Sequence, residues 1–188
     1  MKILDYRRFY ESVLLKLTDN SDEAMISKIS ELDRPPSKIL EISCGNGADS
    51  IKLKEMGYLV TCTDNNPDYV ENSRKNGINS IIHDTSQPFP FDDGEFDVTY
   101  SRLGLHYFDR DKLEEIFSEI ARITKRHLVY SVKVSEDDIR TGKVILSPSD
   151  WREITERNFK VLTFEEKSGL LYGNQSRWLE ITAEKIHS

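Results

Sequence analysis

One strand–turn–helix unit constrains the fold of this chain more than any other feature. Residues 38–43 read KILEIS, an apolar run typical of a buried strand, and two glycines, Gly45 and Gly47, follow it at once. Residues 48–56 have helical character and stop at Gly57, which can adopt the left-handed conformation that ends a helix. Glycines in such a turn let the backbone bend tightly and approach a ligand. The unit therefore predicts a layered α/β fold with a binding site at the turn.

The alternation of strand and helix continues along the chain. Further strands are predicted over 58–63, 79–83, 96–100 and 128–134, and helices over 67–75 and 109–124. Strands joined by helical crossovers run parallel, because the helix returns the chain to the same end of the sheet. Two final strands, 159–166 and 177–184, follow a helix near 148–157, and the segment 167–176 that joins them lacks helical periodicity, so they should pair antiparallel. We predict a three-layer, doubly wound, Rossmann-like fold: a seven-stranded, mostly parallel sheet with one antiparallel strand near the C-terminus.

The length of 188 residues suits a single domain. Apolar residues at helical spacing predict two N-terminal helices, over about 6–17 and 25–32. We expect residues 1–34 to form a helical cover and 37–134 to form the half that binds the main ligand. Residues 135–188 should complete the sheet, on the side where any second ligand would bind.

Composition excludes several classes of protein. The chain carries 33 acidic and 26 basic residues, a net charge of −7 that disfavours nucleic acid and anionic membrane surfaces as partners. No apolar run exceeds three residues, so neither a transmembrane helix nor the apolar core of a signal peptide is present in the sequence. Cys44 and Cys62 lie 18 residues apart without a metal-binding pattern. They are interpreted as buried thiols, which favours a cytoplasmic location and no metal site.

Polar residues follow the ends of the predicted strands. Asp64 ends the second strand, 17 residues after Gly47, where a carboxylate can accept hydrogen bonds from both hydroxyls of a ribose. Asp84 and Thr85 follow the third strand, and Ser101 follows the fourth. The carboxyl ends of parallel strands share one edge of the sheet, so these residues predict a nucleotide-like ligand there.

The ordered motifs resemble one known family. They read ILEISCGNGADSIKL, VTCTDNN and HDTSQPFPFDDGEFDVTYSRLGLHYF, followed by KLEEIFSEIARIT and HLVYSV, and together they span about residues 37–134. This text resembles the class I S-adenosylmethionine-dependent methyltransferases of the small-molecule type. The resemblance implies S-adenosylmethionine as cofactor, S-adenosylhomocysteine as product, and in-line displacement of the sulfonium methyl by a small-molecule acceptor.

The resemblance also implies roles for residues of the first motif. Glu41 is similar to the acidic residue that orients the glycine loop and the amino end of the cofactor's methionine. Gly45 and Gly47 would lie under that methionine, and Ser101 would contact it through its backbone. Ser43 stands where the family has its first motif glycine, so the turn carries a Cβ atom at this point.

Other residues are assigned to the nucleoside by the same resemblance. Asp64 would hold the ribose hydroxyls and Asn65 would lie beside the adenine. Asp84 would accept a hydrogen bond from the adenine amino group, supported by Thr85. Tyr10, on the first predicted helix, would belong to a lid over the cofactor.

A catalytic base is needed only if the acceptor must lose a proton, and His106 is the candidate because it follows the fourth strand. Arg102 could pair with an acidic acceptor or with Asp109. Segments 135–147 and 172–174 are expected to wall the acceptor pocket. Trp151 and Trp178 occupy apolar positions of their elements and are expected in the core.

Two alternatives stay open on the sequence. The chain could be a catalytically inert cofactor-binding or interaction protein that kept the fold. It could also be a nicotinamide-binding oxidoreductase, because Gly45-x-Gly47-x-x-Ser50 approaches the dinucleotide motif and Asp64 would suit its ribose. Against this second alternative, Asp84-Thr85 would have no role. We expect a monomer or a weak homodimer.

Overall fold

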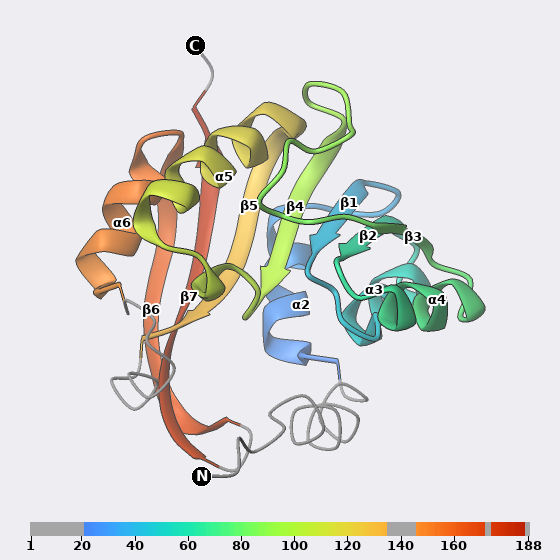
Figure 1. Cartoon of the computed structure of the whole chain (residues 1–188), viewed down its shortest axis with the longest axis horizontal. Helices are drawn as coiled ribbons and strands as arrows, with labels where there is room; N and C mark the ends of the chain where they lie inside the picture. The colour runs from blue at the N-terminus through green and yellow to red at the C-terminus, as the bar shows by residue number, and fades with distance from the viewer. Residues whose placement is uncertain (1–20, 135–145, 172–173, 187–188) are drawn as a thin grey trace, which may run out of the picture.

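A computed structural model describes residues 21–134, 146–171 and 174–186. Its sheet has seven strands in the order β3-β2-β1-β4-β5-β7-β6 (Figure 1). The strands are β1 Lys38–Ile42, β2 Leu59–Asp64, β3 Asn79–Ile82, β4 Phe96–Arg102, β5 Thr124–Lys133, β6 Phe159–Leu171 and β7 Asn174–Lys185. The helices are α2 Glu23–Leu32, α3 Ala48–Glu55, α4 Pro67–Lys75, α5 Arg110–Ile123 and α6 Pro148–Glu156, with a short 3-10 helix, η1, at Leu105–Tyr107.

The strand directions confirm the predicted fold class. Strands β3, β2, β1, β4 and β5 pair in parallel, and β7 runs antiparallel to both β5 and β6. The chain winds from β1 outward to β3 and then returns to place β4 on the other side of β1. The carboxyl ends of β1 and β4 therefore form the point where the winding reverses, which is where this type of sheet binds ligands.

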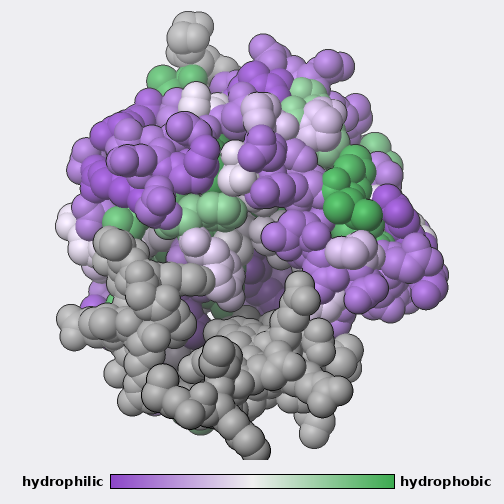
Figure 2. Space-filling model, viewed as in Figure 1, coloured by the Kyte–Doolittle hydropathy of each residue, from purple (hydrophilic) through white to green (hydrophobic). Residues whose placement is uncertain are grey.

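Two hydrophobic layers hold helices against the sheet. On one face, α2 and α3 pack on the central strands through a buried cluster (Met25, Ile26, Ile29, Ile39, Leu53, Tyr58, Val98, Tyr100 and Val129). On the other face, α5 and α6 cover β4, β5 and β7, and Trp151 of α6 is buried there as expected. The outer surfaces of α5 and α6 are hydrophilic (Figure 2), and Arg110 of α5 pairs with Asp150 and Glu153 of α6.

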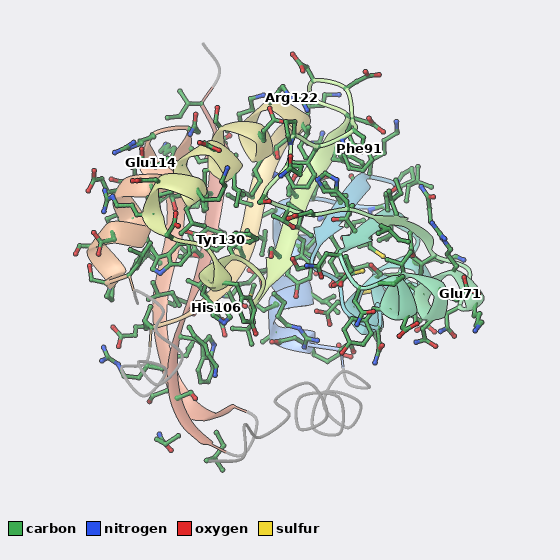
Figure 3. The ribbon with its side chains drawn as sticks, viewed as in Figure 1. Glu71, Phe91, His106, Glu114, Arg122 and Tyr130 are labelled. Carbon is green, nitrogen blue, oxygen red and sulfur yellow. The ribbon has the colours of Figure 1, made fainter. Side chains whose placement is uncertain are left out.

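The crossover from β3 to β4 contains no helix within residues 83–95, all of which are described. Arg122 of α5 holds this crossover in place, because its guanidinium donates to the carbonyl oxygens of Phe89 (2.9 Å) and Phe91 (2.7 Å) (Figure 3). The crossover begins with Asp84 and Thr85, so α5 helps to position one wall of the site.

The prediction that residues 167–176 only join the two last strands is wrong. The two last strands instead continue as one long hairpin whose pairing extends to Leu171 and Asn174, whereas β5 pairs with β7 only as far as Trp178. The hairpin thus projects beyond β5 (Figure 1). The sequence did not indicate this extension, because backbone pairing between two strands does not require an alternating apolar pattern. Trp178 lies at the start of this projection and is half-buried, with its indole N–H donated to Glu180 at 3.0 Å, so its prediction as a core residue is also wrong.

Candidate functional site

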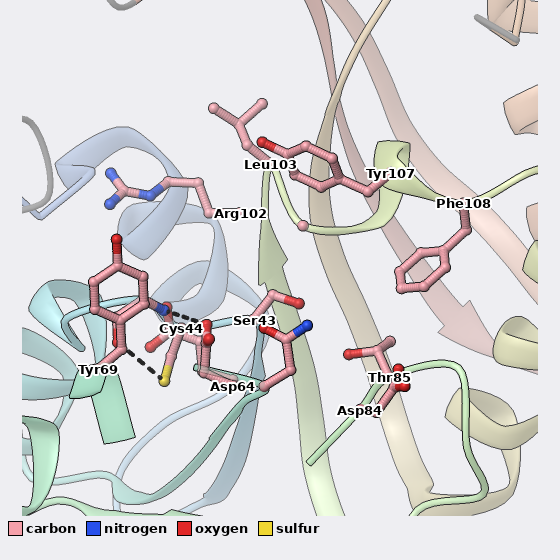
Figure 4. Close-up of a pocket in the computed structure, with 14 residues that line it drawn as sticks. Ser43, Cys44, Asp64, Tyr69, Asp84, Thr85, Arg102, Leu103, Tyr107 and Phe108 are labelled. Atoms are coloured by element: carbon pink, nitrogen blue, oxygen red, sulfur yellow. Dashed lines mark hydrogen bonds between the residues drawn. The ribbon is translucent and has the colours of Figure 1, made fainter. Parts of the chain in front are cut away.

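A cavity of about 450 Å³ opens at the carboxyl ends of β1, β2 and β4 (Figure 4). Fourteen described residues line it: Glu41, Ser43, Cys44, Gly45, Asp64, Asn65, Tyr69, Asp84, Thr85, Arg102, Leu103, Gly104, Tyr107 and Phe108. They come from the turn after β1, the ends of β2 and β4, the start of α4, and the segments that follow β3 and β4. The cavity therefore occupies the reversal point of the sheet.

The turn after β1 is built from left-handed residues. Gly45 (φ 54°) and Gly47 (φ 76°) adopt this conformation, and so does Ser43 (φ 58°), although serine has a Cβ atom. Left-handed geometry costs a residue with a Cβ roughly 1–2 kcal/mol, which explains why glycine is the usual choice at this point of the motif. Serine in place of glycine at position 43 thus keeps the turn but adds mild backbone strain to it.

Asp64 is tied to this turn by hydrogen bonds. The backbone N–H of Gly45 donates to its Oδ2 (2.9 Å), and that of Asn66 donates to its Oδ1 (2.9 Å). Burial raises the pKa of Asp64, against the effect of these backbone donors. Each carboxylate oxygen has a further lone pair, so the group can still accept from two hydroxyls of a ribose.

Asp84 forms a second acceptor on the next strand end. Its side chain is exposed, and Ser86 donates its backbone N–H to Oδ1 at 2.9 Å. This hydrogen bond lowers the pKa of Asp84, which stays ionised and ready to accept from a ligand amino group. Thr85 beside it is buried, and Asn65 and Tyr69 line the cavity between Asp84 and the glycine turn.

The end of the cavity beside β1 is highly charged. Glu41 is buried and accepts a hydrogen bond from Ser50 Oγ at 2.5 Å. Burial and the neighbouring Asp49 raise the pKa of Glu41 well above its usual value. Arg102 forms an ion pair with Asp49, with 2.9 Å between Nε and Oδ2.

One interpretation of the sequence is corrected here, and one residue had been missed. Arg102 does not pair with Asp109, which instead accepts from the backbone of Lys112 at the start of α5. Asp49, missed in the sequence, is the partner. Its position in the first turn of α3 gave no signal, because an acidic residue there is ordinary for a helix N-terminus.

The predicted binding residues divide into two groups. Those that line the cavity are Glu41, Ser43, Gly45, Asp64, Asn65, Asp84 and Thr85. Gly47 instead caps α3, and Ser101 donates its hydroxyl to the carbonyl of Ile42 at 3.2 Å. Tyr10 lies outside the described residues, as do most of segment 135–147 and residues 172–173.

His106 lies in η1 after β4 (Figure 3), half-buried, with its ring centroid 4.4 Å from that of Tyr107. It is not among the residues that line the cavity, whereas Leu103, Gly104, Tyr107 and Phe108 around it are. The sequence analysis singled out the titratable residue of this segment and missed its apolar neighbours. For Tyr107 and Phe108 the aromatic side chain was the available signal.

Among the described residues, no three His, Cys, Asp or Glu side chains gather into a metal site, and no helix is long and apolar enough to cross a membrane. Cys44 and Cys62 are both buried free thiols, as expected. The polar groups of the cavity suit an organic ligand with a ribose, an amino group and an amino-acid end, which is the makeup of S-adenosylmethionine.

Comparisons with known proteins agree with this geometry. A family model described as a methyltransferase domain matches residues 39–127. An uncharacterized methyltransferase of Synechocystis is 27% identical over 92 residues, which cover 48% of this chain and 43% of that protein. The chain thus matches less than half the length of this relative.

Solved structures share the fold over most of the chain. A SAM-dependent methyltransferase of Methanosarcina mazei superposes with a TM-score of 0.74 at 18% identity, covering 86% of this chain and 98% of that one. A TehB-like SAM-dependent methyltransferase of Corynebacterium glutamicum gives 0.73 at 18% identity, covering 97% of both. The fold is the Rossmann-like fold of these methyltransferase structures. Over residues 39–127 the chain is similar to methyltransferase domains, and its solved neighbours are S-adenosylmethionine-dependent methyltransferases.

Proposed function

We propose that this protein transfers the methyl group of S-adenosylmethionine to a small-molecule acceptor. The observation that carries the proposal is the placement of Glu41, Asp64 and Asp84 on one cavity, each at or near the carboxyl end of a different strand. Their order along the sheet edge, from β1 through β2 to β3, is the order of an ammonium group, a ribose and an adenine in such a ligand.

The chain's own residues would bind and orient the reactants. Bound S-adenosylmethionine supplies an activated methyl group on its sulfonium. Glu41 would hold the ammonium, Asp64 the ribose and Asp84 the adenine amino group. Orientation of two reactants in this way can supply several kcal/mol of rate enhancement. Leu103, Tyr107 and Phe108 form an apolar wall that would exclude water beside the acceptor.

His106 is proposed as the base for an acceptor that must lose a proton. Its imidazole lies beside Tyr107, which lines the cavity, and is not itself among the lining residues. A base can act through one water or after a small rearrangement when substrate binds, so this geometry is compatible with the role.

Fold neighbours support a small molecule as the acceptor class. One is a geranyl diphosphate C-methyltransferase of Streptomyces coelicolor (TM-score 0.70), and another is a magnesium protoporphyrin IX methyltransferase of Synechocystis (0.69). The two acceptors named there differ greatly in size and shape. The acceptor of this chain is therefore proposed only as a small molecule.

A second candidate function is cofactor binding without methyl transfer. A [4+2]-cyclase superposes on this chain with a TM-score of 0.71 at 17% identity, so the fold also carries other chemistry. The family match over residues 39–127 is to a methyltransferase domain, so it does not favour the nicotinamide-binding alternative.

Calorimetry with S-adenosylmethionine and S-adenosylhomocysteine tests the proposal. We expect both to bind with micromolar affinity, and a screen of metabolite classes for S-adenosylhomocysteine formation should identify an acceptor. Absence of binding at high micromolar ligand would reject the proposal. Binding without turnover across the screen would favour the second candidate.

A further inference from the structure

Cys44 and Cys62, the two cysteines of the chain, lie together at the wall of the cavity. Both are buried free thiols of one small cluster with Ile78, and Ile51 of α3 packs against it. Cys44 is one of the residues that line the cavity (Figure 4), whereas Cys62 behind it is 0% exposed. Neither thiol has a part in the proposed methyl transfer. The pair therefore forms a reactive group on the cavity that the proposed function does not use.

The backbone brings the two side chains together. Cys62 of β2 is in register with Glu41 of β1 and with Ser80 of β3, so these three side chains point to the same face of the sheet. Cys44 follows β1 in the turn that leads into α3. Its backbone N–H donates to the carbonyl oxygen of Thr63, the residue after Cys62, at 3.0 Å. The positions of both cysteines are thus fixed by strand pairing.

A hydrogen bond joins the two thiols, with Cys44 as donor and the sulfur of Cys62 as acceptor. This bond, helped by Ser80 with its Oγ 3.2 Å from the Cys62 sulfur, lowers the pKa of Cys62 to about 7 against the effect of burial. The same bond and burial raise the pKa of Cys44. Transfer of the shared proton from Cys44 to Cys62 places the negative charge on the sulfur at the cavity. The thiolate is the nucleophilic form of cysteine, so the pair can react there.

We propose that Cys44 and Cys62 are a site of reversible oxidation, which hydrogen peroxide entering the cavity converts to a disulfide that weakens ligand binding. The Cys44 thiolate attacks one peroxide oxygen, so that an S–O bond forms, the O–O bond breaks, and the hydroxide that leaves takes a proton from solvent to become water. The Cys62 sulfur then attacks the sulfenic acid on Cys44. The S–S bond forms, the S–O bond breaks, and a second water leaves with the proton of Cys62. Two electrons pass from the thiols to the peroxide.

The effect on binding follows from the position of Cys44 in the turn after β1. Cys44 lies between Ser43, which is left-handed, and Gly45, whose N–H donates to Asp64 at 2.9 Å. A covalent bond to β2 draws Cys44 out of the cavity wall and shifts this hydrogen bond. By linkage, a ligand that binds the oxidised form more weakly must oppose the disulfide by the same factor. The oxidation is independent of the proposed function, and only its effect on S-adenosylmethionine rests on that function.

Peptide mapping tests the disulfide. The wild-type protein is treated with hydrogen peroxide, blocked with iodoacetamide in denaturant and digested with trypsin without a reductant. Cleavage after Lys38, Lys52 and Lys54 places the two cysteines on separate peptides, 39–52 and 55–74. We expect mass spectrometry to find these peptides linked, and dithiothreitol to release them. Two free thiols, a sulfinic acid at Cys44 or a bond between two copies of the chain would overturn the inference.

Calorimetry with S-adenosylmethionine tests the effect on binding. Peroxide should weaken the affinity of the wild-type protein by about 10-fold, the range of one lost hydrogen bond, and dithiothreitol should restore it. Cys62→Ser is the matched variant, because Cys44 then has no second thiol and no loss should be reversed by dithiothreitol. Oxidised methionine is not confused with the disulfide, since its reduction requires dedicated reductases. Thermal unfolding checks that the variant is folded, and Cys44→Ser repeats the comparison from the other side.

A ligand-protection experiment completes the test. In a fixed mixture of oxidised and reduced dithiothreitol, saturating S-adenosylmethionine should lower the ratio of disulfide to free thiols by the same factor of about 10. A linked pair whose affinity is unchanged, or an equal reversible loss in Cys62→Ser, would overturn the effect on binding. Failure of the reduced wild-type protein to bind S-adenosylmethionine would overturn the proposed function, while peptide mapping would still decide whether the disulfide forms.

Discussion

Ser43 and Gly104 meet closely at the rim of the cavity. A Cβ atom added to Gly104 would lie 2.6 Å from the Cβ of Ser43 and 2.9 Å from its Oγ. Ser43 already adopts a left-handed conformation at φ 58°. The extra Cβ in the turn after β1 is therefore accommodated by the absence of one in the segment after β4.

Replacement of Gly104 by alanine should destabilise the protein by about 1–3 kcal/mol, because two Cβ atoms cannot share this space. In a Ser43→Gly background the same replacement should cost less, since the two contacts with Ser43 are gone and only Ser101 Oγ, at 2.9 Å, stays that close. Chemical denaturation of the two single variants and the double variant measures the coupling. Equal costs in both backgrounds would show that the two residues do not constrain each other. Gly104 has φ −96°, so left-handed strain makes no contribution to its replacement; Gly94→Ala, with φ +61° and no atom within 4 Å, shows the size of that strain for comparison.

Asp64→Ala should weaken the affinity for S-adenosylmethionine by about 1–3 kcal/mol, because the ribose would lose its charged acceptor. The matched control is Asp68→Ala, an exposed aspartate in the first turn of α4. Calorimetry measures the affinity of both variants for S-adenosylmethionine. An unchanged affinity in Asp64→Ala would place the ribose elsewhere in the cavity.

The raised pKa of Glu41 predicts that the free energy of unfolding depends on pH. Burial and Asp49 raise its pKa in the folded protein, and Ser50, Cys62 and Arg102 also face it. A carboxyl whose pKa is raised on folding binds more protons in the folded state, so its contribution favours folding at low pH. That contribution is lost as pH rises from about 4.3, the ordinary value of glutamate, through the raised folded pKa.

Glu41→Gln removes this penalty while keeping a partner for Ser50. The variant should therefore be more stable than the wild-type protein at neutral pH, by about 1.4 kcal/mol for each unit of pKa difference removed, yet bind S-adenosylmethionine more weakly. Denaturant unfolding between pH 4 and 8 measures the difference. The prediction fails if the two proteins have parallel stability profiles.

Asp33 should show the opposite dependence at the other end of the sheet. Burial of Asp33 opposes its ionisation. Hydrogen bonds from Ser37 and from the backbone of Arg34, together with the positive charge of Arg126, outweigh burial and lower the pKa of Asp33. A lowered pKa contributes stability that is present above the unfolded value, about 3.9, and is lost as pH falls through the folded value.

Arg126→Met should remove part of that stability, about 1 kcal/mol for a pair whose arginine is 43% exposed. The loss should be visible at neutral pH, begin to shrink near pH 4 and vanish as the pH falls through the lowered pKa of folded Asp33. Lys125→Met, the exposed neighbour, is the control. A loss of the same size at every pH would mean that Arg126 acts by packing rather than by its charge.

His106→Ala tests the proposed base. If the acceptor is a hydroxyl, kcat should fall by about 100-fold or more while the affinity for S-adenosylmethionine is unchanged. His83→Ala, whose ring packs on Phe89 at 4.8 Å, is the matched histidine control. Normal turnover of His106→Ala at saturating acceptor would show that His106 is not the catalytic base.

The order of the elements could be predicted from the sequence, and so could most of the residues proposed for the cofactor, in that they line one cavity. Apolar periodicity depends on which face of an element is buried, and a doubly wound sheet buries its strands on both sides, so β1 to β5 stood out as short apolar runs between helices. Asp64 and Asp84 were found because a strand that ends in an aspartate places it at the ligand edge, whatever the packing around it. These are local properties, and local sequence carries them.

The tertiary structure alone decided which residues meet across the sheet. Asp49 and Arg102 lie 53 positions apart, and Ser43 and Gly104 lie 61 apart. Nothing within either neighbourhood encodes such a contact, because it depends on the register of β1 against β4 and on the placement of α3. The same holds for the long β6–β7 hairpin, which is held by backbone pairing that any side-chain pattern permits. The sequence by itself determined the fold class and identified most of the residues proposed to bind the cofactor, and packing between distant segments decided which charged side chains pair.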